Sequence, residues 1–291
     1  MVQPSNPVRL TRAPAHLLRP ILADTMAKLS AFDLYLRVVS RSTKRFDWFD
    51  AETLASPQGD ALTRLLHAFN RQGIAPNRKA ASASLLLRLG WAGGFAIGAY
   101  LICRRVPTVR DYAVSFSPTM LLQSIWIREA LFVGMRDDRL AGGTEWVETI
   151  GESDLRTRLL QSLVVFTEPV VTTQHAWSGF SRHALWAMVT SSWAEQFVNI
   201  ARQIGDEPRG VREARAIFEL VPELNRAAPR LYAVHGGHIA RTCQRRSACC
   251  LYFKSSTRYF CASCPIIPES ERLERNRAWV EKQPLPEPRV S

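Results

Sequence analysis

The chain has 291 residues, of which 46% are hydrophobic and 22% are charged, and 38 Lys and Arg face 26 Asp and Glu. This length allows one large domain or two ordinary ones, and the composition excludes a disordered or fibrous protein. The net charge of +12 favours anionic partners: nucleic acid, lipid headgroups or negatively charged small complexes. Because the basic residues are spread along the chain and form no basic arm, we do not expect nucleic acid as the partner.

The N-terminal residues 1–14 are interpreted as an irregular basic leader. Prolines and arginines interrupt the apolar segment that a secretory signal would need. The stretch LGWAGGFAIGAYLIC at 89–103 is uncharged but shorter than the roughly 20 apolar residues of a spanning helix. We therefore expect a buried helix there, no transmembrane segment and a cytoplasmic location, with peripheral membrane contact left open.

Helical periodicity covers much of the chain and is clearest at about 182–204. One face of that segment carries apolar side chains four residues apart: Leu185, Val189, Trp193 and Phe197. Ser181 is placed as its N-cap and Gly205 as its C-terminal stop. Further helices are expected at about 15–38, 59–72, 81–103, 153–165, 210–220 and 270–283.

Aromatic and β-branched residues predict strands at Tyr112–Ser117 and Gln123–Arg128, and Leu163–Val171 has a similar composition. The expected fold class is α+β, predominantly α-helical with a small antiparallel sheet. The turn-like sequence HGGH at 235–238 precedes a cysteine-rich region. We place a boundary there, with a mainly helical domain at 1–234 and a C-terminal metal-binding segment with a polar tail at 235–291.

Five of the six cysteines fall between Cys243 and Cys264. Because no export signal is visible, clustered thiols predict a metal site rather than disulfides. Cys249 and Cys250 are adjacent, whereas Cys261 and Cys264 form a C-x-x-C pair. Structural zinc sites prefer a spacer between paired ligands, and a binuclear iron–sulfur core is wider than one zinc ion. The adjacent pair therefore favours [2Fe–2S], and zinc stays the alternative.

The other metal-binding residue types are interpreted as structural. Cys243 is taken as a spare thiol and Cys103 as a buried small side chain. His235 and His238 are expected to face solvent in a turn.

The segment RRSACCLYFKSSTRYFCASCPI at 245–266 closely resembles the C-terminal signature of the ferric iron reductase FhuF-like family, the siderophore-iron reductases. That signature is an adjacent Cys pair, an aromatic-rich stretch, and a C-x-x-C followed by Pro. The resemblance implies that Cys249, Cys250, Cys261 and Cys264 bind the iron of a [2Fe–2S] cluster. A weaker resemblance is carried by SRHALW at 181–186, although Ala187 stands where family members commonly have Gly.

The resemblance further implies a one-electron reductase that releases Fe(II) from ferric siderophores in the cytoplasm. Oxygen donors hold Fe(II) less tightly than Fe(III), so reduction is a release step. We find no dinucleotide-binding glycine motif, and therefore expect an electron-donor reductase or ferredoxin as partner.

Basic and aromatic residues surround the cysteines in sequence. The cationic group is expected to raise the potential of a cluster and attract an anionic complex; it comprises Arg241, Arg245, Arg246, Lys254 and Arg258. The aromatic group is expected to shield the cluster from water; it comprises Tyr252, Phe253, Tyr259 and Phe260. The competing hypotheses are a zinc-bearing nucleic-acid or protein-interaction module, and an iron–sulfur sensor.

Overall fold

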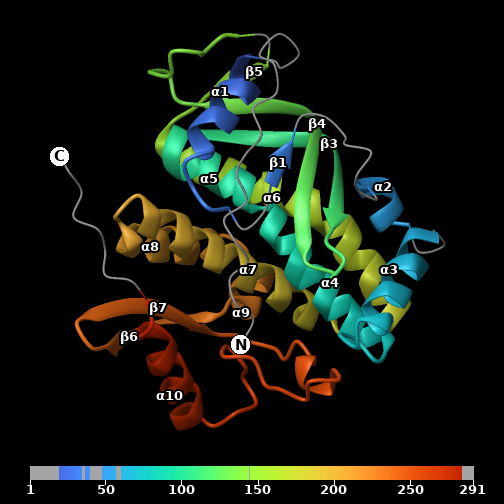
Figure 1. The fold of residues 1–291 in the computed structure, drawn as a ribbon. Coiled ribbons are helices and arrows are strands. Elements are labelled where there is room, and N and C mark those ends of the chain that lie inside the picture. Colours follow the sequence, from blue (N-terminus) through green and yellow to red (C-terminus); the bar gives the residue numbers. More distant parts are fainter. Residues whose placement is uncertain (1–19, 35–36, 40–47, 57–59, 144, 284–291) are drawn as a thin grey trace.

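The computed structural model describes residues 20–34, 37–39, 48–56, 60–143 and 145–283 (Figure 1). The N-terminal half of its elements comprises α1 (Pro20–Leu29), β1 (Arg37–Val39), β2 (Trp48–Asp50), α2 (Ala51–Leu54), α3 (Asp60–Arg71), α4 (Arg78–Ala92), α5 (Gly94–Cys103), β3 (Arg105–Phe116), β4 (Leu122–Gly134) and β5 (Trp146–Thr149). The C-terminal half comprises α6 (Glu152–Ser178), α7 (Arg182–Gln203), α8 (Glu207–Glu219), α9 (Pro222–Ala227), β6 (Arg230–Gly236), β7 (Ile239–Arg245), the 3₁₀ helix η2 (Tyr252–Lys254) and α10 (Glu269–Val280). The fold is α+β and predominantly helical, which confirms the predicted class.

The larger sheet is built on the long antiparallel hairpin β3–β4, which contains both predicted strands. It has the order β1-β4-β3-β2, and β5 also pairs with β4. Strands β1 and β5 run parallel to β4, so this sheet is mixed. The two-stranded ribbon β6–β7 is the purely antiparallel sheet among the described residues.

Two sequence expectations about local structure are wrong. Leu163–Val171 lies within the helix α6 and forms no strand. Leu163, Val170 and Val171 are buried there while Val165 is 64% exposed, so the apolar residues follow a helical face and packing overrides their β propensity. The helix expected over about 15–38 is confined to α1 in the described residues, and β1 follows it.

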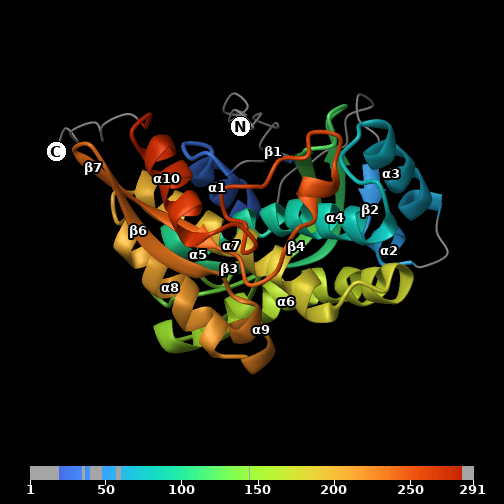
Figure 2. The same ribbon diagram turned by 90° about the horizontal axis from the view of Figure 1, so that it is seen from below.

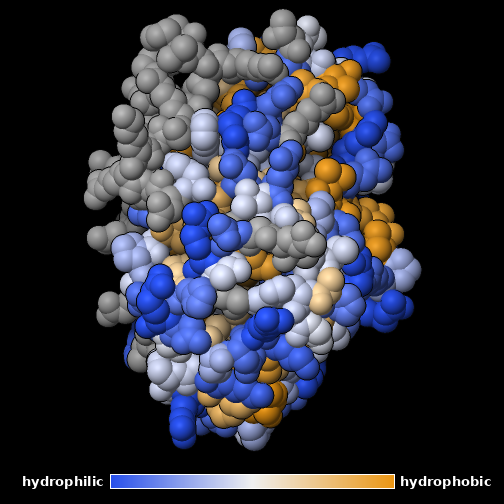
Figure 3. Space-filling model, turned by 90° about the vertical axis from the view of Figure 1, so that its right-hand side faces the viewer, coloured by the Kyte–Doolittle hydropathy of each residue, from blue (hydrophilic) through white to orange (hydrophobic). Residues whose placement is uncertain are grey.

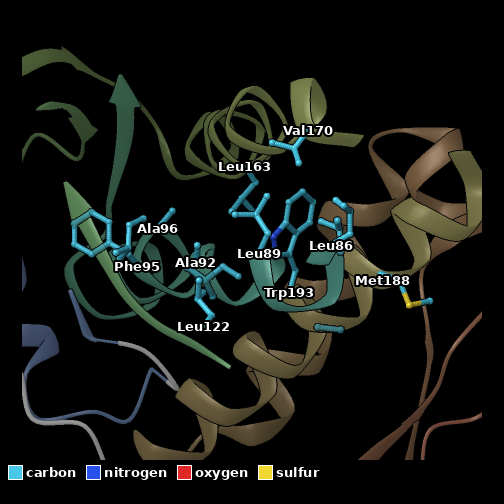
Figure 4. Packing of buried hydrophobic residues seen from close by; sticks show 14 of the residues in the cluster. Leu86, Leu89, Ala92, Phe95, Ala96, Leu122, Leu163, Val170, Met188 and Trp193 are labelled. Atoms are coloured by element: carbon cyan, nitrogen blue, oxygen red, sulfur yellow. The ribbon is translucent and has the colours of Figure 1, made fainter. Parts of the chain in front are cut away.

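Helix α7 is the centre of the core. The predicted face of Leu185, Val189, Trp193 and Phe197 is completely buried, and Ser181 caps the helix by accepting a hydrogen bond from the Ala184 amide. Figure 4 shows Trp193 among apolar side chains of α4 and α6, including Leu86, Leu89 and Leu163. Gly90 permits this close packing, because a Cβ there would lie 2.7 Å from the Cβ of Ser192.

The stretch Arg78–Cys103, which forms α4 and α5, is long and apolar enough to cross a membrane by length and composition alone. However, 83% of its most apolar window is buried inside the fold. The predicted buried helix is thus observed as two helices joined at Gly93. Their burial is that of core helices, in agreement with the expectation of no transmembrane segment.

The chain from β6 onward covers one side of the helical body (Figures 1 and 2). Ribbon β6–β7 is followed by the loop 246–267, which we call the cysteine lobe, and then by α10. Residue 235, where the sequence analysis places a boundary, falls inside strand β6. The leader 1–14 and the end of the polar tail lie outside the described residues.

Candidate metal centre

The adjacent cysteines lie directly before a left-handed turn. Leu251 has φ +59°, an unusual conformation for a residue with a side chain. Its amide donates a hydrogen bond to Cys249 Sγ over 3.3 Å, and η2 begins at the next residue. The chain therefore turns sharply at the residue that follows the Cys pair.

The C-x-x-C pair is held in its own tight turn. The Cys264 amide donates to the Cys261 carbonyl over 3.0 Å, and the Ser263 carbonyl accepts from the Arg246 amide over 3.0 Å. The second contact fixes this turn to the chain leaving β7. The amide of Ile266 donates to Cys264 Sγ over 3.4 Å, so each Cys pair has one thiol that already accepts a backbone hydrogen bond.

The two pairs meet at Cys250 and Cys261, whose sulfur atoms are 3.7 Å apart. Two thiolates bound about 2.3 Å from one tetrahedral metal lie roughly 3.8 Å apart, so this spacing suits a shared metal. Cys249 also interacts with Cys250, and that hydrogen bond lowers the pKa of the Cys249 thiol. The hydrogen bond with Cys250, together with burial, raises the pKa of Cys261.

The two Cys pairs predicted as ligands therefore meet through Cys250 and Cys261, and Cys249 and Cys264 belong to the same two turns. Cys250 and Cys264 are buried, and the other two are half-buried. Among the described residues, however, no group of three or more His, Cys, Asp or Glu already surrounds the position of a single metal ion. No protein-family model matches this chain, and no curated protein sequence is significantly similar to it.

The donor set fits a [2Fe–2S] cluster: four thiols, two of them with backbone N–H donors, and a pair at the spacing of two ligands on one iron. Hydrogen bonds to the sulfurs and partial burial are the features by which a protein sets the potential of such a cluster.

Arg246 is the one cation of the predicted basic group that donates to a cysteine sulfur in the described structure. It is 8% exposed, and its Nη1 lies 3.1 Å from Cys261 Sγ. Its Nε donates to Ser191 Oγ on α7 over 3.0 Å, and Ser191 in turn donates to Gln244 over 3.0 Å. Burial alone would lower the pKa of Arg246, but its interactions with Cys261, Cys250 and Glu195 raise it above its ordinary value, so the guanidinium stays charged.

Arg88 is a second buried cation that the sequence analysis missed. It comes from α4, is 9% exposed, and donates from Nε to the Met120 carbonyl over 2.5 Å. Burial lowers its pKa to about 10, while the charges of Tyr252 and Cys250 oppose that shift. The sequence feature that could have indicated it is a single Arg within the apolar run SLLLRLGWAGG. An arginine buried among apolar residues needs partners for its charge.

The aromatic residues of the lobe divide into two groups. Phe253 and Phe260 stack with ring centroids 5.0 Å apart, which brings the two ends of the inter-cysteine segment together. Tyr259 is 43% exposed, and Arg275 of α10 lies over its ring at 4.8 Å. Arg275 also donates to the Phe260 carbonyl over 2.8 Å, so α10 holds the segment that enters the C-x-x-C turn.

The remaining candidate residues lie apart from the four thiols. Cys243 lines a pocket of about 110 Å³ with Thr242 and Trp279, and burial raises its pKa to about 11. His235 and His238 are exposed at the β6–β7 turn, as expected. Cys103, expected to be buried, is only half-buried, because it is the last residue of α5.

Proposed function

We propose that this chain is a one-electron reductase of ferric siderophore complexes that releases Fe(II) in the cytoplasm. The observation that carries the proposal is the meeting of the two Cys pairs beside a buried arginine, with Cys250 and Cys261 sulfurs 3.7 Å apart. Cys249, Cys250, Cys261 and Cys264 would hold a [2Fe–2S] cluster. When bound, such a cluster supplies a centre that accepts and gives up one electron.

The protein's own residues would set how readily that electron is accepted. A positive charge at sulfur stabilises the more negative, reduced state, and Arg246 provides it at Cys261. The amides of Leu251 and Ile266 act in the same direction at the sulfur atoms of Cys249 and Cys264, to which they donate hydrogen bonds. Partial burial of the thiols limits the access of water.

The reaction needs an electron from outside the chain. We propose a reductase or a ferredoxin as donor, since the sequence has no dinucleotide motif. One electron enters from that donor and one leaves to Fe(III), which becomes Fe(II). The oxygen ligands of the complex hold Fe(II) weakly, so the reduced metal departs.

Anaerobic reconstitution with iron and sulfide tests the proposal. We expect two irons and two sulfides per chain, a visible spectrum bleached by dithionite, and reoxidation by a ferric siderophore with Fe(II) trapped by a ferrous-selective chelator. A colourless protein that retains one zinc would instead establish the zinc module. A reducible cluster that ferric siderophores cannot reoxidise, in a protein that retains DNA at low salt, would favour the sensor.

Ligand variants test the residues. Cys250→Ser should lose the cluster or destabilise it severely, because Cys250 belongs to the closest pair of sulfurs. Cys103→Ser is the matched control, since Cys103 ends α5 and has no contact with the four thiols among the described residues. An unchanged absorption spectrum in Cys250→Ser, or a lost one in Cys103→Ser, would show that the ligand set is wrong.

A further inference from the structure

A pocket of about 860 Å³ opens between β2, α3 and the turn that joins β3 to β4. Its volume is that of a small-molecule site rather than of a surface irregularity. Its walls combine aromatic rings with basic side chains, chiefly Trp48, Phe49, Phe116, Arg64, His67 and Arg71. Figure 3 shows the side of the molecule on which α2 and α3 lie in Figure 1. On this side, hydrophobic patches are surrounded by hydrophilic residues.

The charge of the pocket selects for an anion. Arg64 and Arg71 are exposed on α3, seven residues apart and hence on one side of the helix. Neither forms an ion pair with a carboxylate in the described part of the chain, whereas Arg128 and Arg182 each pair with two. The two guanidinium groups are therefore available to an incoming ligand with negatively charged oxygen atoms.

The aromatic wall adds flat surfaces. Phe116 makes edge contacts with Phe49 and Phe69 at centroid distances of 5.8 and 6.4 Å. The guanidinium of Arg64 lies 5.8 Å from the centroid of Phe49. This arrangement suits a ligand that carries aromatic rings as well as negative charge, because rings pack against rings and anionic oxygens meet the arginines.

The pocket is joined to the cysteine lobe at two points. Beyond α3, the Gly73 carbonyl accepts a hydrogen bond from the Ser256 amide over 2.9 Å. Gly73 has φ +66°, and a Cβ there would lie 2.5 Å from Ser256 Oγ, so the backbone of the lobe rests directly on this turn.

The second junction is Arg88. Its Nε donates to the carbonyl of Met120, a residue of the pocket wall, over 2.5 Å. Its guanidinium lies 5.3 Å from the ring centroid of Phe69. The helix that carries Arg88, α4, also packs against η2, the 3₁₀ helix that follows the adjacent Cys pair. One helix therefore reaches from the pocket wall to the cysteine lobe.

We propose that this pocket binds the ferric substrate as an anionic complex whose oxygen ligands sit on aromatic rings, the catecholate class of siderophore. The inference rests on the proposed reductase function and adds a place and a ligand class to it. Fe(III) held in the pocket would become Fe(II) by taking up one electron, which the external donor described above supplies by way of the centre that the four cysteines would hold.

The binding test uses gallium(III) tris-catecholate, which has the shape and charge of the ferric complex but takes up no electron. Isothermal titration calorimetry on the loaded chain should show binding. The double variant Arg64→Gln with Arg71→Gln should weaken it about 100-fold, roughly tenfold for each charge-assisted contact removed. Ala68→Trp, which fills the pocket from α3, should abolish binding.

Arg212→Gln is the matched control, because Arg212 is exposed on α8 and distant from the pocket wall. Its affinity should equal that of the unaltered chain. The arginine variants should keep the absorption spectrum and melting temperature, since the substituted arginines are exposed and form no ion pair within the described part of the chain. A neutral gallium trihydroxamate should bind more weakly than the tris-catecholate.

The outcomes separate this inference from the reductase proposal. If the gallium complex does not bind, or binds the pocket variants as it binds the unaltered chain, the pocket assignment is overturned even where ferric complexes reoxidise the reduced protein. If the gallium complex binds the unaltered chain and the pocket variants bind it much more weakly, the pocket assignment stands. Failure of the ferric complex to reoxidise the protein would then count against the reductase alone.

Discussion

At the scale of the single residue, Arg246 is the side chain whose effect on the proposed centre can be measured most directly. Its charge lies 3.1 Å from Cys261 Sγ and is buried. Removing it should make the reduced state less stable. We expect Arg246→Gln to lower the reduction potential by about 60 mV or more, which for one electron is a tenfold change in the equilibrium constant. A spectroscopic redox titration measures this.

The neighbouring residue supplies the control for that experiment. Arg245 is exposed, so Arg245→Gln should leave the potential nearly unchanged. The reduction potential of Arg246→Lys, which keeps the charge but loses the fixed guanidinium, should lie between those of Arg246→Gln and Arg245→Gln. An unchanged potential in an Arg246→Gln protein with an intact spectrum would refute a tuning role for this side chain.

Residue-scale reasoning from sequence succeeded where the signal is local. The Cys spacing predicts that the two pairs approach each other, and Cys250 and Cys261 do so. The Ser181 cap follows from its place before an apolar periodicity. It failed for Arg88, because α4 and the cysteine lobe are far apart in sequence and only the folded chain packs α4 against η2. The left-handed conformation of Leu251 could not be predicted either, since leucine has no preference for that conformation.

At the scale of the element, prediction was best for helices with recognisable ends. The extents of α3, α7 and α10 follow the expected ranges closely. Helix α6 was predicted only in part, because its β-branched residues mimic a strand and become helical through packing on the core. The parallel pairing of β1 with β4 could not be predicted, since it joins segments far apart in the chain.

A buried ion-pair network fixes α1 to the start of β3. Arg105 is 1% exposed and pairs with Asp24 at 2.6 Å and also with Asp138. Burial alone would raise the pKa of Asp24, but hydrogen bonds from Arg105, Arg139 and Lys28 lower it to about 2. A carboxyl with a lowered pKa stabilises the fold above its ordinary pKa of about 3.8, and this stabilisation is lost as pH falls towards 2.

We therefore expect Arg105→Gln to lower the free energy of unfolding at neutral pH by about 3–5 kcal/mol, because it leaves buried carboxylates without their partner. It should also remove part of the acid dependence of stability between about pH 4 and 2, where Asp24 contributes about 2 kcal/mol. Urea unfolding across that pH range measures both effects. Arg104→Gln is the adjacent control, since the Arg104 pair with Asp137 is exposed and contributes little.

At the scale of the whole molecule, the cysteine lobe and the helical body share one hydrophobic core. Cys250 is a buried member of the main core cluster, and Leu251, Tyr252 and Cys261 pack against it. Hydrogen bonds from Arg246 to Ser191 and from Ser247 to the Ala227 carbonyl join the lobe to α7 and α9. A second small cluster of Val234, Ile239 and Val280 joins the ribbon β6–β7 to α10.

This sharing predicts how the molecule responds when metal is removed. If the four thiols hold the proposed cluster, its removal takes away their common centre and one constraint on the turn at Leu251. We expect the metal-free protein to exchange backbone amide hydrogens faster in the cysteine lobe and at the exposed end of α10. The body should respond only where it touches the lobe, at the face of α7 that carries Ser191.

Hydrogen-exchange mass spectrometry on the loaded and metal-free chain measures this pattern. The hairpin β3–β4 is the internal reference, because its long antiparallel ladder has no part in the lobe and should exchange equally in both states. Equal exchange across the lobe would mean that metal does not stabilise it, whereas faster exchange throughout β3–β4 would mean that the whole fold depends on the metal. We expect faster exchange in the lobe alone, because the proposed cluster would hold one side of the lobe while packing on the core at α7 holds the other.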